Sequence, residues 1–137
     1  MNKIFFFILI RLILTAYGKK VCIQNLQCDC ELRDDRLICK EVNKTARITD
    51  FSIPFKDLFY IGIFDKSFPI VGDFIFKDID VYQIELSRNE IEKFSNYTFC
   101  GVKRLGEITL NTNKLKHLND LIEGISICNI KTIKTLI

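Results

Sequence analysis

Cysteine is the residue type in this chain with the clearest potential for chemistry. The chain has six cysteines, and four of them lie close together: Cys22, Cys28, Cys30 and Cys39. Zinc is a weak interpretation, because no histidine accompanies them and the C-x-C step differs from the C-x2-C pairs of structural zinc sites. Clustered cysteines in an even number favour disulfides in an exported protein. Three pairings of the four are open, and Cys100 and Cys128 are candidates for a further bridge.

Catalytic chemistry has little support among the other reactive side chains. The single histidine, His117, follows a lysine and is expected on an exposed bend, and no serine lies in a G-x-S-x-G nucleophile elbow. Two pairs of carboxylates could be imagined as acid and base, Asp78 with Asp80 and Glu90 with Glu92. Charged residues at alternating positions more often mark a solvated edge. We therefore predict no catalytic residue, no metal site and no cofactor, and we do not expect an enzyme.

A pattern of apolar residues around an asparagine occurs twice, with a period of 24 residues from Asn89 to Asn113 (113 − 89). The apolar positions are Val81, Ile84, Leu86, Ile91, Phe94, Phe99 and Val102 in one copy, and Leu105, Ile108, Leu110, Leu115 and Leu118 in the next. The spacing L-x-x-L-x-L-x-x-N-x-L is typical of a leucine-rich repeat. The asparagine is expected to be buried, because its amide can both donate to and accept from the backbone of adjacent coils.

A weaker copy precedes these two, with Lys66 in the place of the asparagine. Its apolar positions are Leu58, Ile61, Ile63, Phe68, Val71, Phe76 and Ile79. One such unit does not bury its own apolar face, so the pattern predicts stacked coils. The fold class that we expect is an α/β-type repeat solenoid, a short leucine-rich repeat horseshoe with a parallel sheet on its concave side.

The N-terminus has the features of a secretory signal. Residues 1–18 combine a charged start, an apolar core and small residues before a cleavage point after Gly18. Arg11 interrupts the apolar run, so the uninterrupted apolar stretch is shorter than the about 20 residues that a membrane-spanning helix needs. In an exported chain, the sequons that begin at Asn43 and Asn96 become glycosylation sites. We predict a secreted, extracellular protein without a membrane anchor after cleavage.

The rest of the chain divides into a cysteine-rich N-terminal cap over 19–50 and about three repeats over 51–137, with no recognisable C-terminal cap. Beyond Leu118 the residues either begin a fourth strand or form a terminal amphipathic helix. Without a cap, an apolar edge would be exposed, which favours a homo-oligomer or a partner at this edge. Its members would be Ile127, Ile130, Ile133 and Leu136.

The charge balance argues against nucleic acid as a partner. The full chain has 20 basic and 17 acidic residues, and loss of residues 1–18 with Lys3 and Arg11 leaves a charge of +1 (18 − 17). The basic residues are scattered among acidic ones, whereas a phosphate-binding surface shows a basic stripe.

With its cysteine cluster followed by repeats, the chain resembles extracellular leucine-rich repeat proteins that begin with a cysteine-clustered cap. That resemblance implies a hairpin of strands at 28–32 and 36–39 around a turn at Asp34 and Asp35. It also implies two bridges, Cys22 to Cys30 and Cys28 to Cys39. The stretch 55–115 looks more narrowly like a group of secreted arthropod repeat proteins that includes the non-catalytic subunit of shrimp luciferin monooxygenase, although this chain has fewer coils.

Side chains alternate along a strand, so the residues between core positions should form rows on the concave face of the sheet. These are the candidate partner-binding residues: Tyr60, Phe64, Asp65, Gln83, Glu85, Ser87, Arg88, Glu107, Thr109, Asn111 and Thr112. A solvated polar sheet without a ligand is the alternative. Solenoids use this face for partners, so we predict a recognition module that binds an extracellular protein or a glycan. Two alternatives remain, a non-catalytic subunit that stabilises a separate secreted enzyme and a small disulfide-rich effector.

Overall fold

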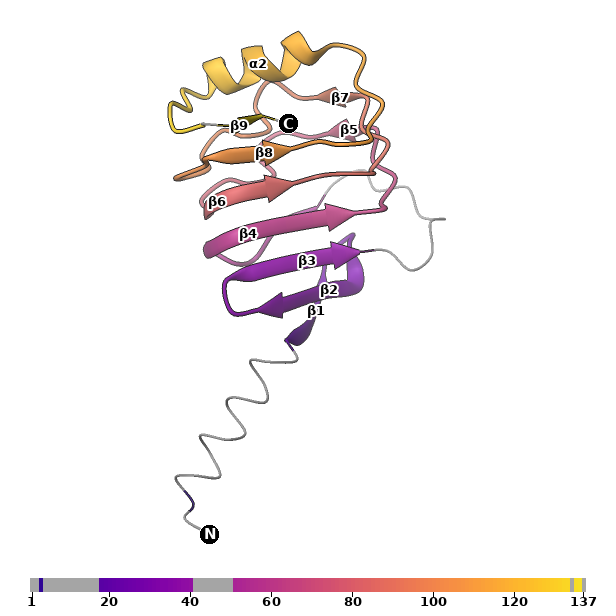
Figure 1. Ribbon diagram of the computed structural model, residues 1–137, viewed down its shortest axis with the longest axis vertical. Helices are drawn as coiled ribbons and strands as arrows, with labels where there is room; N and C mark the ends of the chain where they lie inside the picture. Colours follow the sequence, from indigo (N-terminus) through magenta and orange to yellow (C-terminus); the bar gives the residue numbers. More distant parts are fainter. Residues whose placement is uncertain (1–2, 4–17, 41–50, 134, 137) are drawn as a thin grey trace.

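The computed structural model describes residues 3, 18–40, 51–133, 135 and 136. Seven strands form one sheet in the order β1-β2-β3-β4-β6-β8-β9 (Figure 1). Their bounds are β1 (Lys19–Ile23), β2 (Gln27–Arg33), β3 (Arg36–Lys40), β4 (Asp57–Phe64), β6 (Asp80–Glu85), β8 (Glu107–Thr109) and β9 (Thr135–Leu136). Nearly all of the expected signal peptide, the sequon at Asn43 and the end of the expected cap lie outside the described residues.

The first three strands form an antiparallel meander, of which the hairpin β2–β3 was expected and β1 was not. β1 pairs with β2, and β2 pairs with β3. The turn between β2 and β3 contains Asp34, which has a φ of 53°. β3 then lies parallel to β4, and from there to β9 every neighbouring pair of strands is parallel. The hairpin is therefore continuous with the rest of the sheet.

The disulfide pairing implied by the family resemblance is wrong. Cys30 is bonded to Cys39, with a Cα–Cα distance of 4.0 Å, so neither Cys22 to Cys30 nor Cys28 to Cys39 forms. The physical reason is the register of β2 and β3, which places Cys30 directly opposite Cys39 with both side chains turned into the core. Cys22 is also disulfide-bonded.

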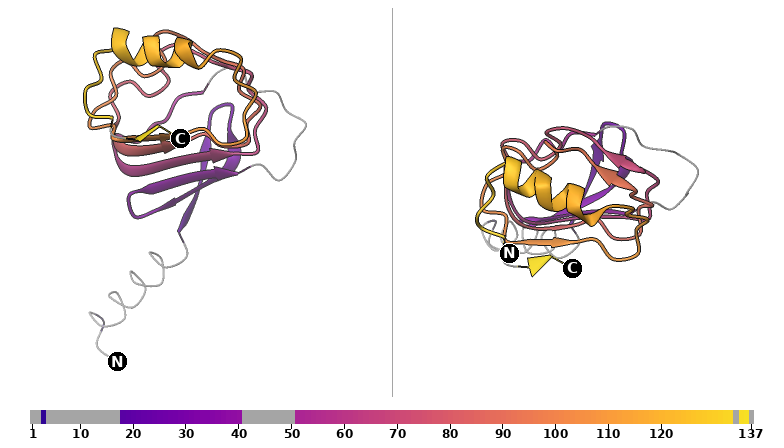
Figure 2. Two further views of the ribbon diagram at one scale, coloured as in Figure 1. Left: turned by 45° about the horizontal axis from the view of Figure 1, so that its top comes forward. Right: turned by 90° about the horizontal axis from the view of Figure 1, so that it is seen from above.

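From β4 onward the chain forms successive coils, each with one strand of the large sheet and a return segment. The register advances by 23 or 24 residues, with Tyr60 beside Gln83 and Gln83 beside Glu107. Two return segments pair through β5 (Ile70–Val71) and β7 (Lys93–Phe94). The return segments lie on one side of the sheet, and the core fills the space between (Figure 2).

The apolar positions predicted from the repeats are buried in the core, apart from Val102 and Leu115, which are half-buried, and Leu118. Equivalent isoleucines stack on one another from coil to coil, and the Phe76 and Phe99 rings stack with centroids 5.6 Å apart. Leu118 is 50% exposed because it begins a helix and does not close a coil.

Buried asparagines connect the coils where the strands end. Asn89 is fully buried; its side-chain oxygen accepts from the Lys66 N–H at 2.9 Å, and its amide nitrogen donates to the Ile63 carbonyl at 2.7 Å. Asn113 repeats the arrangement one coil later, accepting from the Asn89 N–H at 3.1 Å and donating to Leu86. The prediction that Asn89 is buried and paired is confirmed.

After the last of these turns the chain forms the helix α2 (Leu118–Ile127), which packs against β7, and then the short strand β9 beside β8. The amphipathic helix was one of the two alternatives for this region, and the Cys100–Cys128 disulfide tethers its end. Ile127 of the expected apolar edge is 46% exposed, whereas Ile130 and Ile133 pack partly against the core. Among the described residues no helix is long and apolar enough to cross a membrane.

Candidate binding face

The seven-stranded sheet has one face turned away from the core, which we call the open face. Figure 2 shows the return segments and α2 on the core side and none of the described elements over the open face. The observed register groups the candidate residues into the expected rows. One row is Tyr60, Gln83 and Glu107, and the next is Gly62, Glu85 and Thr109.

The candidate residues differ in exposure. Tyr60, Ser87 and Thr109 are buried among their neighbours. The half-buried members are Phe64, Asp65, Gln83, Glu85 and Glu107, and the exposed members are Arg88, Asn111 and Thr112. A partner would therefore touch the second and third groups, while the buried residues hold them in position.

Two aromatic rings close over a glycine at the centre of the open face. A Cβ atom at Gly62 would lie 2.4 Å from the Tyr60 hydroxyl oxygen and 2.7 Å from a ring carbon of Phe64. The absence of a side chain at Gly62 therefore lets both rings lie across β4. The guanidinium of Arg36 lies 4.3 Å from the Tyr60 ring centroid, and that of Arg88 lies 5.3 Å from the Phe64 ring centroid, within the range of a cation–π contact.

Tyr60 also links two strands through a hydrogen bond. Its hydroxyl donates to a carboxylate oxygen of Glu85 at 2.7 Å. Burial raises the pKa of Tyr60 above its usual value, and the hydrogen bond and negative charge of Glu85 raise it further, while Arg36 lowers it. Tyr60 is therefore a neutral donor at physiological pH and keeps Glu85 in place.

The open face also includes three residues that were not among the predicted ones: Arg36, Ile38 and Lys40. The parallel register of β3 with β4 places Arg36 beside Tyr60, Ile38 beside Gly62 and Lys40 beside Phe64. All three are exposed, including 39% of Ile38. Their place on this face follows from the contact between the hairpin and β4, which the repeat pattern does not encode.

The open face has charges of both signs. Arg36 and Lys40 on β3 are basic, whereas Glu85 on β6 and Glu107 on β8 are acidic. The two carboxylates accept from neutral donors, since Gln83 donates to Glu107 at 3.0 Å and Tyr60 donates to Glu85. At the strand ends the exposed Arg88 pairs with Asp65.

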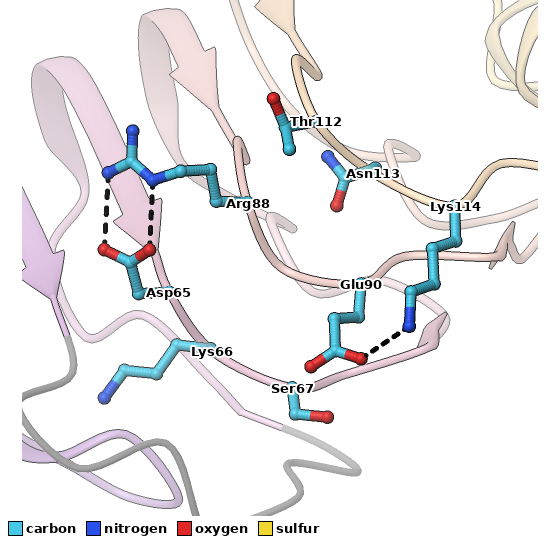
Figure 3. Close-up of a pocket in the computed structure, with 8 residues that line it drawn as sticks. All are labelled: Asp65, Lys66, Ser67, Arg88, Glu90, Thr112, Asn113 and Lys114. Atoms are coloured by element: carbon cyan, nitrogen blue, oxygen red, sulfur yellow. Dashed lines mark hydrogen bonds and ion pairs between the residues drawn. The ribbon is translucent and has the colours of Figure 1, made fainter.

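A hollow of about 300 Å³ adjoins the open face at the carboxyl ends of the strands (Figure 3). Its lining is polar: Asp65, Lys66, Ser67, Arg88, Glu90, Thr112, Asn113 and Lys114. Arg88 donates to both carboxylate oxygens of Asp65, at 3.0 and 3.3 Å, and Lys114 donates to Glu90 at 2.9 Å. These hydrogen bonds raise the pKa of Arg88 and of Lys114.

Of the residues considered for catalysis, Glu90 lines this hollow and the others do not, and three of them form ion pairs between coils. Asp80 pairs with Arg104, Glu90 with Lys114 and Glu92 with Lys116. His117 is exposed at the start of α2. Within the described part of the chain, no group of three potential ligands is placed to hold a metal ion.

Comparison with protein-family models, with curated proteins and with solved structures finds no match to this chain.

Proposed function

We propose that this chain is a secreted leucine-rich repeat module that recognises a partner protein through the open face of its sheet. The observation that carries the proposal is the centre of that face, where Tyr60 and Phe64 lie over Gly62 and each ring contacts an arginine. Phenylalanine and arginine are enriched at the centres of protein interfaces, where a few residues supply most of the binding energy. The buried Tyr60 holds Glu85 in position.

The fold assignment is part of the proposal and is supported by the stacked coils. The period of 23 or 24 residues, the parallel strands and the buried asparagine that bonds to the preceding coil are each what a leucine-rich repeat requires. The hairpin then serves as the N-terminal cap, because it continues the sheet and covers the first coil.

Export is supported by the cysteine chemistry. The structure contains disulfides at Cys30–Cys39 and Cys100–Cys128, and such bonds persist in oxidising compartments. The signal-like sequence of residues 1–18 would direct the chain into the secretory pathway.

The charge distribution indicates the chemistry of the partner surface. A partner should present acidic residues to Arg36 and Lys40 and basic residues to Glu85 and Glu107, since complementary charges fix the orientation of binding and speed association. Ile38, which is exposed beside Gly62, supplies an apolar contact on β3 between Arg36 and Lys40.

The test is affinity capture from the extracellular fluid of the source with the full secreted chain. Phe64→Ser and Arg88→Glu should each weaken capture of the same partner at least about tenfold, which corresponds to loss of an interface residue worth about 1.4 kcal/mol. Lys93→Glu, on the return side of the coil, is the matched control and should leave capture unchanged. Undiminished capture by both open-face variants, or loss only with Lys93→Glu, would overturn the assignment.

A further inference from the structure

An apolar patch lies on the return side of the coils, away from the open face. Phe74 and Tyr97 are 49% and 48% exposed, and their rings stack with centroids 5.8 Å apart and planes 13° apart. Ile70, on β5, is 56% exposed. Neighbouring exposed apolar side chains can form an interaction site.

The backbone of Phe74 supports a specific role for its ring. Phe74 has a φ of 56°, in the left-handed region that bulky side chains rarely occupy. Its N–H donates to the Tyr97 carbonyl of the next coil at 3.0 Å. Strained conformations cluster at functional positions, and here the strain places an aromatic ring in solvent beside a second one.

The acceptor residue of a glycosylation sequon lines a hollow beside this patch. The hollow measures about 520 Å³, and its lining includes Ile70, Asp73, Lys93, Asn96 and Tyr97. Asn96 is the acceptor residue of the sequon Asn96-Tyr97-Thr98, and it is exposed. The acceptor residue of the sequon therefore belongs to the wall of the hollow.

We propose that an N-linked glycan on Asn96 occupies this hollow and covers the stacked rings of Phe74 and Tyr97. A sugar has an apolar C–H face, which suits an aromatic surface, and hydroxyls, which suit Asp73 and Lys93 at the same site. Binding sites that combine aromatic side chains with a few polar groups are typical for such ligands. The inference depends on the export proposed above and is independent of binding at the open face.

The position of Thr98 requires that the glycan is attached before this coil folds. Thr98 is fully buried, and its hydroxyl donates to the Val71 carbonyl at 3.0 Å and lies 3.1 Å from the Ser95 carbonyl oxygen. An enzyme that recognises the threonine hydroxyl of the sequon has no access to it in the folded protein.

The transfer itself uses an oligosaccharide linked to a lipid pyrophosphate. A bond forms between the side-chain nitrogen of Asn96 and the anomeric carbon of the sugar, and the bond from that carbon to the pyrophosphate oxygen breaks. The lipid pyrophosphate leaves with the electron pair, and one proton of the amide is lost. No oxidant or reductant is needed.

The experiment is a double-mutant cycle on the full chain secreted from eukaryotic cells, with glycan occupancy read by peptide mass spectrometry. Asn96→Gln removes the glycan, and Phe74→Asn removes the ring while keeping a residue that tolerates the left-handed backbone. We expect Asn96 to be occupied and Asn96→Gln to lower the unfolding temperature by about 4 °C. In the Phe74→Asn background the same change should have little effect, because the contact is already lost.

A second stacked pair provides the control. Phe59, which is 45% exposed, stacks on Tyr82 at 5.4 Å where β4 and β6 begin, and Tyr82, unlike Tyr97, does not line the hollow. Phe59→Ser and Asn96→Gln should therefore have additive effects on the unfolding temperature.

Additive effects of Asn96→Gln and Phe74→Asn would overturn the inference. An unmodified Asn96 in secreted protein would also overturn it and would leave the export proposal standing. Retention of the chain inside the cell, with both sequons bare, would overturn the export proposal as well.

Discussion

The ammonium of Lys66 lies 2.9 Å from a carboxylate oxygen of Asp29 and is almost completely buried. Lys66 occupies the position that asparagine holds in the next two coils, and its side chain extends toward the hairpin instead of bonding to a preceding coil. The pair therefore fastens the first coil to β2. The repeat pattern predicts only a weaker copy at Lys66 and does not indicate this contact with the hairpin.

The first prediction compares the two partners of this pair. Asp29→Ala should destabilise the protein by about 3 kcal/mol or more, because it leaves a buried ammonium without its carboxylate. Lys66→Met should cost less, about 1–2 kcal/mol, since Asp29 is partly exposed and can be hydrated. Denaturant unfolding of both variants measures the difference. An equal or opposite order would show that the ammonium reaches water.

The second prediction concerns the asparagines that connect the coils. Asn89→Ala should destabilise the protein by about 1–3 kcal/mol, because it leaves the Lys66 N–H and the Ile63 carbonyl without their buried partner. Asn113→Ala is the matched comparison and should cost less, since Asn113 is only half-buried and water can replace its amide. Chemical denaturation measures both values. An Asn89→Ala variant with unchanged stability would contradict the role of these asparagines in connecting the coils.

The third prediction concerns the Cys100–Cys128 disulfide, which joins residues 28 apart and tethers the end of α2. Replacing both cysteines by serine should destabilise the protein by about 3–4 kcal/mol through the entropy of the opened loop. Amide exchange over Leu118–Ile127 should increase more than exchange over β4. Non-reducing peptide mapping should recover Cys30 linked to Cys39 as well as this bridge, and unchanged exchange in the helix would show that packing on β7 is sufficient.

Features that depend on the repeat pattern could be predicted from the sequence, whereas features that depend on contacts between distant segments could not. Apolar positions such as Ile61, Ile84 and Ile108 were predictable because the repeat determines which side chains enter the core. The pairing of Cys30 with Cys39 depends on the hairpin register, which sequence left open among three pairings. The open-face role of Arg36, Ile38 and Lys40 depends on contact between the hairpin and β4, and no periodic pattern encodes that contact.

The last prediction uses the raised pKa of Tyr60. The unfolded chain has an ordinary tyrosine pKa near 10, and the folded protein holds the proton more tightly, because of burial and Glu85. The contribution of this proton to stability is therefore complete below about pH 10 and declines as the pH rises further.

Denaturant unfolding between about pH 8 and about pH 11.5 tests this. The stability of the wild-type protein should fall relative to that of Tyr60→Phe above about pH 10, because only the wild type must retain the extra proton. Glu85→Gln should make the decline shallower, since it removes the negative charge but keeps an acceptor for the hydroxyl. A constant difference between the wild type and Tyr60→Phe across the whole range would show that Tyr60 ionises equally in both states, and the hydrogen bond that orders the centre of the open face would then have no energetic weight.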